Sequence, residues 1–203
     1  MLPVGYLPCT QDPPAGKNMA RVIDEIVAEA RAAEASGWDG CFITEHHQQE
    51  DGYLPNPLLT AGLIGMKTRR IKVGTCVLLL PLYHPVRVAE DCAIVDQATR
   101  GRLVLSIGVG YQQPDFDAFE VPIESRARRT EEALAILRQS WHGGRFSFEG
   151  SHFKLMNVLG YAAALSGERS AGLDGLVDAA RTSARGPNRR RMDRRPRSVA
   201  SRD

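Results

Sequence analysis

The stretch Ile71-Lys72-Val73-Gly74-Thr75-Cys76-Val77-Leu78-Leu79-Leu80 decides the fold, because it is a nearly unbroken run of apolar and β-branched residues. Such a run is typical of a strand that is buried on both faces of a parallel sheet. Pro85 follows shortly afterwards and suits the first turn of a helix. The sequence therefore predicts a strand over residues 71–80, followed by a helix over residues 85–97.

The same order of strand and helix extends in both directions from this stretch. Further strands are predicted over residues 2–8, 38–44 and 102–108, further helices over residues 18–36, 55–67 and 124–141, and a β-hairpin over residues 146–155. Four such units at a spacing of roughly 30 residues are typical of βαβ crossovers, which build a parallel sheet. We expect an α/β fold, either an open doubly wound sheet or a barrel, with its chemistry at the carboxyl ends of the strands.

Composition limits the classes of protein that the chain can represent. With 203 residues, 43% of them hydrophobic, and a net charge of +2, we expect one core and no general affinity for nucleic acid. No apolar run approaches the roughly 18 residues of a membrane span, and the first residues lack the pattern of a signal peptide. Cys9, Cys41, Cys76 and Cys92 lack the spacing of a zinc site, so we expect reduced core thiols in a cytoplasmic protein.

Two adjacent histidines, His46 and His47, follow the strand predicted over residues 38–44. Neighbouring residues of an extended chain point to opposite faces, so the pair is poorly arranged to hold one metal ion, and we expect no metal site. One histidine at the carboxyl end of a strand can transfer protons near neutral pH. The other is then expected to cap the following loop or to pack against the scaffold.

A glycine-rich turn follows the strand predicted over residues 102–108. Gly108 and Gly110 would let the backbone approach a ligand closely. The turn differs from a dinucleotide-binding fingerprint, because Gln113 stands at the third glycine position and Pro114 introduces a loop where a helix should begin. From these residues alone, a simple turn is favoured over a ligand contact.

Several motifs occur in a fixed order and at regular spacing along residues 1–158. They are TEHH at residues 44–47, Asn56-Pro57, IKVGTCVLLLPLYHPVRVAEDCAIVDQATRGRL at residues 71–103, GVGY at residues 108–111 and DFDAF at residues 115–119. Together they resemble the luciferase-like flavin-dependent monooxygenases. The resemblance implies about the first four βα units of a (β/α)8 TIM barrel, with a flavin at the mouth formed by the carboxyl ends of the strands.

The resemblance also implies roles for the residues of the TEHH motif. It gives His46 the role of the catalytic residue that handles protons while a reduced flavin reacts with O2. Glu45 is expected beside it as part of the flavin site, and His47 is expected to face the scaffold.

Further flavin-binding positions are implied in the next two strands. Cys76 and Val77 match a position where the family often has a cis peptide bond beneath the flavin ring, and Gly110 and Tyr111 match positions that line the flavin. One departure concerns Val109, because relatives that bind the flavin phosphate often have an arginine there. The anchoring of the phosphate is therefore in doubt.

The resemblance implies reduced FMN or a deazaflavin as cofactor, with O2 and a small organic molecule as substrates. A flavin reductase as partner, assembly into a homo-oligomer and the absence of a membrane anchor are further expectations. The alternative is a non-catalytic flavin-binding or partner-stabilising relative, which the departure at Val109 favours. A metal-dependent barrel hydrolase is disfavoured, because the ligand spacing of such an enzyme is absent.

Residues 159–203 form a second part of different composition, in which Ala, Gly, Arg and Ser make up 28 of 45 residues. A disordered basic tail, an arm that binds nucleic acid and a segment translated out of frame are three interpretations. We favour the third, because the composition changes abruptly in the middle of a domain. A complete barrel needs roughly 250 residues, so we expect a truncated enzyme of reduced activity that self-associates through its open sheet edges.

Overall fold

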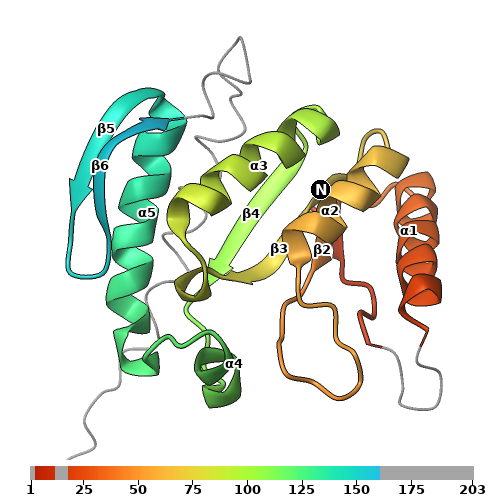
Figure 1. The fold of residues 1–203 in the computed structure, drawn as a ribbon. Helices are drawn as coiled ribbons and strands as arrows, with labels where there is room; N and C mark the ends of the chain where they lie inside the picture. Colours follow the sequence, from red (N-terminus) through yellow and green to blue (C-terminus); the bar gives the residue numbers. More distant parts are fainter. Residues whose placement is uncertain (1–2, 12–17, 161–203) are drawn as a thin grey trace, which may run out of the picture.

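A computed structural model describes residues 3–11 and 18–160, which contain a four-stranded parallel sheet. Its strands lie side by side in chain order: β1 (Gly5–Tyr6), β2 (Gly40–Ile43), β3 (Lys72–Leu79) and β4 (Leu103–Gly108). A helix connects each strand to the next (Figure 1). The predicted α/β fold is confirmed, and this strand order is the one that begins a (β/α)8 barrel.

Four long helices accompany the sheet: α1 (Met19–Ala35), α2 (Pro57–Lys67), α3 (Pro85–Thr99) and α5 (Arg126–His142). Asparagine side chains cap the first two, because Asn18 Oδ1 accepts from the backbone N–H of Arg21 at 3.1 Å and Asn56 Oδ1 accepts from that of Leu59 at 3.0 Å. Each cap satisfies an N–H group that has no partner within the helix. The first helix therefore begins where the sequence predicts, and the second begins two residues after the predicted start at Pro55.

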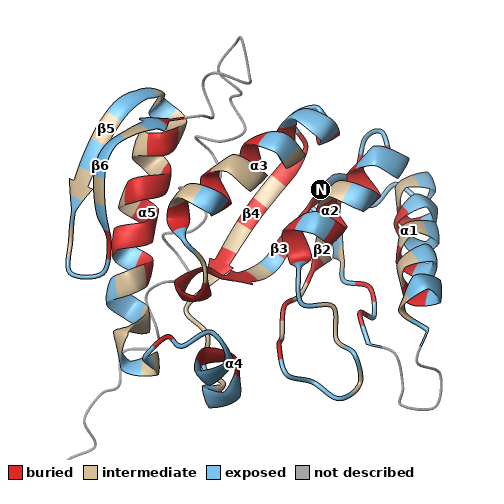
Figure 2. Ribbon diagram, viewed as in Figure 1, coloured by how far each residue is buried: buried red, intermediate tan, exposed pale blue. Residues whose placement is uncertain are grey.

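The core lies between the sheet and these helices, in two main clusters (Figure 2). In the first, Cys41 and Ile43 of β2 pack with Ile26 of α1 and Ile64 of α2. In the second, β4 packs against α3 and α5, with these buried members: Leu103, Leu105, Ile107, Val88, Cys92, Ile136 and Leu137. Apolar burial thus fixes the strand ends relative to one another.

The second face of the sheet is less covered by the described residues. Along β4, Leu103, Leu105 and Ile107 are buried, whereas the residues between them are only half-buried. Successive residues of a strand point to opposite faces, so the half-buried set faces away from the helices. In a closed barrel this is the face that points to the interior.

The region after β4 differs in part from the sequence prediction. Helix α4 (Gln113–Ala118) replaces the loop expected there, because Pro114 lies in the first turn, where its missing N–H needs no partner. Short 3-10 turns, η1 (Leu80–Leu82) and η2 (Ile123–Ser125), lie before α3 and α5. The predicted hairpin is confirmed as an antiparallel pair of β5 (Gly144–Glu149) and β6 (Lys154–Gly160), which is longer than expected.

The four cysteines are free, but only two of them lie in the core. Burial raises the pKa of the Cys41 thiol to about 12, and it also raises the pKa of Cys92. The prediction of core thiols is wrong for Cys9 and Cys76, which are exposed. Cys76 lies on the face of β3 that is turned away from the helices, and Cys9 lies in the segment after β1.

Within the described ranges, no helix has both the length and the apolar character needed to cross a membrane. The interpretations of residues 159–203 concern a segment that lies outside the described residues, apart from Leu159 and Gly160 at the end of β6. The proposed boundary after residue 158 therefore stays a prediction.

Candidate functional site

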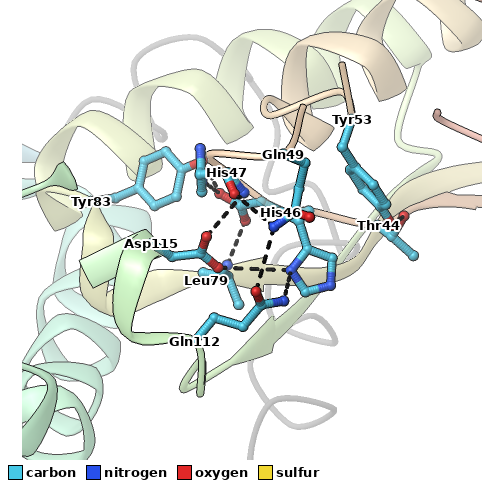
Figure 3. Close-up of polar contacts among 10 residues, drawn as sticks. Thr44, His46, His47, Gln49, Tyr53, Leu79, Tyr83, Gln112 and Asp115 are labelled. Atoms are coloured by element: carbon cyan, nitrogen blue, oxygen red, sulfur yellow. Dashed lines mark hydrogen bonds and ion pairs between the residues drawn. The ribbon is translucent and has the colours of Figure 1, made fainter. Parts of the chain in front are cut away.

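The segment Thr44–His47 continues the extended path of β2 beyond its carboxyl end, and its side chains alternate between two environments. Thr44 and His46 are half-buried, whereas Glu45 and His47 are buried. This alternation is the geometry of extended chain, in which neighbours point to opposite sides. The side chains of the two histidines consequently point to opposite sides of the segment (Figure 3).

Glu45 connects the end of β2 to the end of β3. Its Oε2 accepts from the backbone N–H of Leu79 at 2.6 Å, while its Oε1 accepts from the Tyr83 hydroxyl at 2.5 Å and contacts His47 Nε2 at 2.8 Å. Burial, and then the adjacent Glu45 carboxylate, raise the pKa of Tyr83, so its hydroxyl stays protonated and donates. The carboxylate is turned into the scaffold, and its contact with a cofactor stays a prediction.

His47 faces the scaffold, in agreement with the expectation from the sequence. The ring of His47 contacts Glu45, and the backbone N–H of His47 donates to Asp115 Oδ1 at 3.3 Å. Its ring lies edge-to-face against Phe119, with ring centroids 4.7 Å apart. These contacts join the end of β2 to α4 and to Phe119 at the end of that helix.

His46 lies on the opposite side of the same segment, where 26% of its side chain is exposed. Its Nδ1 is 2.9 Å from Gln112 Nε2 and 3.7 Å from Asp115 Oδ2. The rings of Tyr53 and Tyr111 meet the His46 ring edge-to-face, with centroids 5.1 and 6.2 Å away. Figure 3 shows the amide of Gln112, the buried carboxylate of Asp115 and the ring of Tyr53 around this imidazole. The ring of Tyr111 is its second aromatic neighbour.

Four members of this cluster were not predicted from the sequence: Gln112, Asp115, Tyr53 and Tyr83. Asp115 stands in the quoted DFDAF motif, and Pro114 before it could have indicated a helix start in place of a loop. Nothing in the local sequence indicates the partner of Gln112, because 66 positions separate it from His46.

The peptide bond between Cys76 and Val77 is cis, as the resemblance led us to expect. It lies where the pairing of β3 with β4 becomes irregular, between Thr75 and Leu78. Cys76 is exposed and Val77 is half-buried. A Cβ atom on Gly108 would lie 2.5 Å from Val77 Cγ2, so the glycine at the end of β4 permits the close approach of the two strands.

Gly110, the other glycine of the GVGY turn, is also required by the local structure. Gly110 has φ +73°, and a Cβ atom there would lie 2.8 Å from the Phe116 ring. The residue after it, Tyr111, has 75% of its surface exposed and faces His46. The structure thus brings Gly110 and Tyr111 to the same end of the sheet as His46, and Val109 beside them is half-buried and uncharged.

A separate hollow of about 440 Å³ lies at the opposite, amino end of β3 and β4. Five cationic side chains line it: Arg31, Lys67, Arg69, Arg100 and Arg102. The buried Arg102 directs its N–H groups to the carbonyl oxygens of Gly65, Thr68, Ile71 and Thr99. Its donors therefore satisfy the ends of α2 and α3, and this hollow is a structural region remote from His46.

The arrangement around His46 can position a hydrogen-bonding group beside a planar molecule. Within the part of the chain that the structure describes, no three side chains of His, Cys, Asp or Glu type are grouped to hold a metal ion. The chemical groups available are the imidazole of His46, the buried carboxylate of Asp115 and the exposed ring of Tyr111.

Comparison with protein families gives a match to the model described as luciferase-like monooxygenase over residues 3–167. The alkanal monooxygenase alpha chain of Photorhabdus laumondii is 30% identical over 70% of this chain and 39% of its own length. The F420-dependent glucose-6-phosphate dehydrogenase of Nakamurella multipartita is 32% identical over 64% of this chain and 40% of its own length. The chain spans about 40% of the length of the curated relatives that it matches.

Solved structures agree with the fold. The monooxygenase RslO1 from Streptomyces bottropensis matches with a TM-score of 0.73 and 25% identity, over 77% of this chain and 48% of that one. The oxygenating constituent of 3,6-diketocamphane monooxygenase from Pseudomonas putida, in complex with FMN, matches with a TM-score of 0.67 and 24% identity, over 75% and 43% of the two chains. Both likenesses cover a little under half of the other protein.

Proposed function

Because the chain belongs to the luciferase-like monooxygenase family, we propose that it supplies the carboxyl-end site of a flavin-dependent oxidoreductase. The family match over residues 3–167 carries this proposal. Its local support is His46 at the end of β2, which is hydrogen-bonded to Gln112 and has the buried carboxylate of Asp115 3.7 Å from its Nδ1. When bound there, a reduced flavin would supply two electrons to O2, so that one oxygen atom could be transferred to a small organic substrate while the other leaves as water.

The side chains present fit the ring end of such a cofactor. Exposed Tyr111 and Cys76 and half-buried Val77 offer largely apolar surface to a planar ring, on the side of the sheet that the helices leave uncovered. His46 adds a polar group, and Gly110 lets the turn before Tyr111 pass close to α4. We therefore assign His46 as catalytic and Cys76, Val77, Gly110 and Tyr111 as cofactor-binding, with Glu45 as their support.

The cofactor is proposed to be reduced FMN or a deazaflavin. The FMN complex of 3,6-diketocamphane monooxygenase and the F420-dependent relative from Nakamurella multipartita support these two classes. Val109, which has no charge, gives no anchor for a phosphate at the GVGY turn. We propose that the described residues hold the ring of the cofactor and leave its phosphate to other parts of the protein.

A non-catalytic flavin-binding or partner-stabilising protein is the second candidate, and the uncharged Val109 favours it. Such a protein would bind the flavin ring against Tyr111 without turnover. The two candidates differ in whether His46 alters the reaction of the bound cofactor with O2.

We further propose that the protein forms a homo-oligomer through α2 and α3. Leu59, Leu63 and Met66 share one face of α2 and are 41–71% exposed, and Ile94 of α3 is 58% exposed. The spacing of the three α2 residues places them in one row on the helix. A second copy of the chain would cover this apolar row.

Three further proposals concern the setting of the enzyme. A flavin reductase is proposed to supply the reduced cofactor, because the described site has no second redox group.

A cytoplasmic location is proposed from the free thiols of Cys41 and Cys92, which fit a reducing compartment. Activity of the 203 residues alone is proposed to be reduced, because the described sheet has four strands whereas a closed barrel has eight.

An anaerobic titration with reduced FMN, and separately with reduced F420, tests the main proposal. Wild-type protein and His46→Ala are expected to bind one of the two cofactors with similar affinity, measured by fluorescence. When the complex with reduced FMN is mixed with O2, the wild-type protein should change the rate of FMN reoxidation, and His46→Ala should bring that rate at least about tenfold closer to the rate of free FMN.

His142→Ala is the control, because His142 is exposed at the far end of α5. Binding by wild-type protein with a reoxidation trace equal to that of free cofactor would support the non-catalytic candidate. Binding of neither cofactor contradicts both candidates.

A further inference from the structure

We infer that the Gln112 side chain fixes the proton of neutral His46 on Nε2, so that the ring presents an N–H donor to the site. Gln112 Nε2 lies 2.9 Å from His46 Nδ1. An amide nitrogen can only donate a hydrogen bond, so Nδ1 must accept and carries no proton. In a neutral imidazole the single ring proton then belongs to Nε2.

The orientation of the Gln112 amide follows from a second glutamine. Gln49 Nε2 lies 3.1 Å from the carbonyl oxygen of His47 and 3.5 Å from Gln112 Oε1. If the Gln112 amide were reversed, its NH2 group would face the NH2 group of Gln49, and its oxygen would face His46. The network therefore assigns the amide nitrogen of Gln112 to the imidazole.

The side chain of Gln112 can bond to His46 because it does not cap helix α4, which begins after Gln112. It is the N-cap residue of α4, yet its side chain makes no capping hydrogen bond. Its backbone is fixed by the start of α4 and its amide by Gln49, so the donor to His46 is held from two sides. This is the arrangement expected of a positioning residue, since Gln112 acts through His46.

The surroundings of His46 contain one charged group close to Nδ1. Asp115 Oδ2, on α4, is 3.7 Å away, which is beyond hydrogen-bonding distance. The remaining neighbours are the rings of Tyr53, from the segment before α2, and Tyr111, from the segment after β4. Glu45 and His47 point to the other side of the chain, so Gln112 is the group that hydrogen-bonds Nδ1.

The other ring nitrogen is directed away from Gln112 and Asp115 (Figure 3). Among the described residues, His46 Nε2 has no hydrogen-bond partner, and part of the side chain is exposed. An Nε2–H group in this position can donate a hydrogen bond to an oxygen atom on which negative charge develops. No proton needs to leave the ring, because the stabilisation comes from a donor that is already oriented.

The catalytic consequence of this inference rests on the proposed function, whereas the test of the inference is independent of that function. The inference makes neutral His46 a hydrogen-bond donor toward an oxygen of the cofactor–O2 reaction, and not a base. The ring tautomer itself is a property of the protein without any ligand.

Long-range ¹H–¹⁵N NMR spectra of histidine-labelled protein read the tautomer directly at a pH where His46 is neutral. The His46 signals are identified by their loss in His46→Ala. In wild-type protein we expect Nδ1 to show the shift of an unprotonated nitrogen and Nε2 that of an N–H. In Gln112→Glu the carboxylate accepts from Nδ1, so the proton is expected on Nδ1. Gln113→Glu is the matched control, since it places the same charge one residue away on an exposed side chain.

A wild-type spectrum with the proton on Nδ1 overturns the inference without need of any variant. A spectrum of Gln112→Glu identical to that of wild-type protein overturns it as well. If the tautomer is as inferred and neither reduced FMN nor F420 binds, the proposed function fails and the tautomer assignment stands.

Discussion

Glu45 accepts a hydrogen bond from the backbone N–H of Leu79 at 2.6 Å, which ties the carboxyl end of β2 to that of β3. The same carboxylate contacts the Tyr83 hydroxyl and His47 Nε2. Because three donors hold the buried Glu45 carboxylate in place, the segment that carries it is fixed. The direction of His46, on the other side of the same segment, is fixed with it. The candidate site therefore depends on a carboxylate that faces away from it.

Replacing Glu45 by glutamine is expected to lower the free energy of unfolding by about 1–3 kcal/mol. An amide offers one acceptor oxygen, and its NH2 group would face one of the three donors that the carboxylate now serves. The midpoint of urea unfolding measures the effect. Glu25→Gln is the control, because its pair with Arg21 is exposed, and a loss below about 0.5 kcal/mol is expected there. Equal midpoints for the two variants would contradict the role given to Glu45.

Glu34 predicts how stability changes with pH. Burial by itself would raise its pKa, but the backbone N–H groups of Ile71, Arg70 and Arg69 donate to it and lower the pKa to about 2. Because the pKa is depressed from 4.5 in the unfolded chain, the stabilisation is complete above that value and is lost as the pH falls toward 2.

Urea unfolding of wild-type protein and of Glu34→Gln checks this linkage. The difference in unfolding free energy between them should be largest at pH 6 and should shrink steadily as the pH is lowered below about 4.5. A difference that stays constant over this range would show that the ionised carboxylate does not hold the start of β3.

Gly74 is predicted to tolerate no side chain. A Cβ atom there would lie 1.8 Å from the carbonyl oxygen of Val104 in β4, so Gly74→Ala should destabilise the protein by more than about 3 kcal/mol or prevent folding. The control is Gly62→Ala inside α2, where the new Cβ would meet Val95 at an ordinary 3.5 Å.

Thermal unfolding followed by circular dichroism compares the two glycine variants. Gly62→Ala is expected to be neutral or stabilising by up to about 1 kcal/mol, because alanine favours the helix more than glycine does. Opposite signs for the two substitutions support the close pairing of β3 with β4, and equal effects speak against it.

Leu63→Lys tests the proposed contact between copies of the chain. A lysine in the exposed apolar row of α2 should prevent a second copy from covering it, so the mass measured by light scattering should fall to that of one chain. Gln113→Lys, on the exposed surface of α4 and outside α2 and α3, carries the same change of charge and should leave the mass unchanged. A wild-type protein that is already a monomer at all concentrations refutes the proposal.

Much of the framework could be predicted from the sequence because it depends on local patterns. Apolar runs and helix caps gave the order of strands and helices, and the alternation of extended chain separated His46 from His47. The cis bond at Cys76-Val77 was expected from the resemblance to the family. By contrast, α4 was missed, because Pro114 was interpreted as the start of a loop although it also fits the first turn of a helix.

The sequence by itself determined that this is an α/β protein of the luciferase-like family with His46 at the carboxyl end of a strand. Only the tertiary structure decided that Glu45 turns inward to Leu79 and that Gln112 donates to His46. The physical reason is distance along the chain: 34 and 66 positions separate these pairs, and no local propensity encodes such contacts. They form because packing of β2, β3 and α4 brings these groups within hydrogen-bonding distance, and the buried carboxylate of Glu45 must be paired.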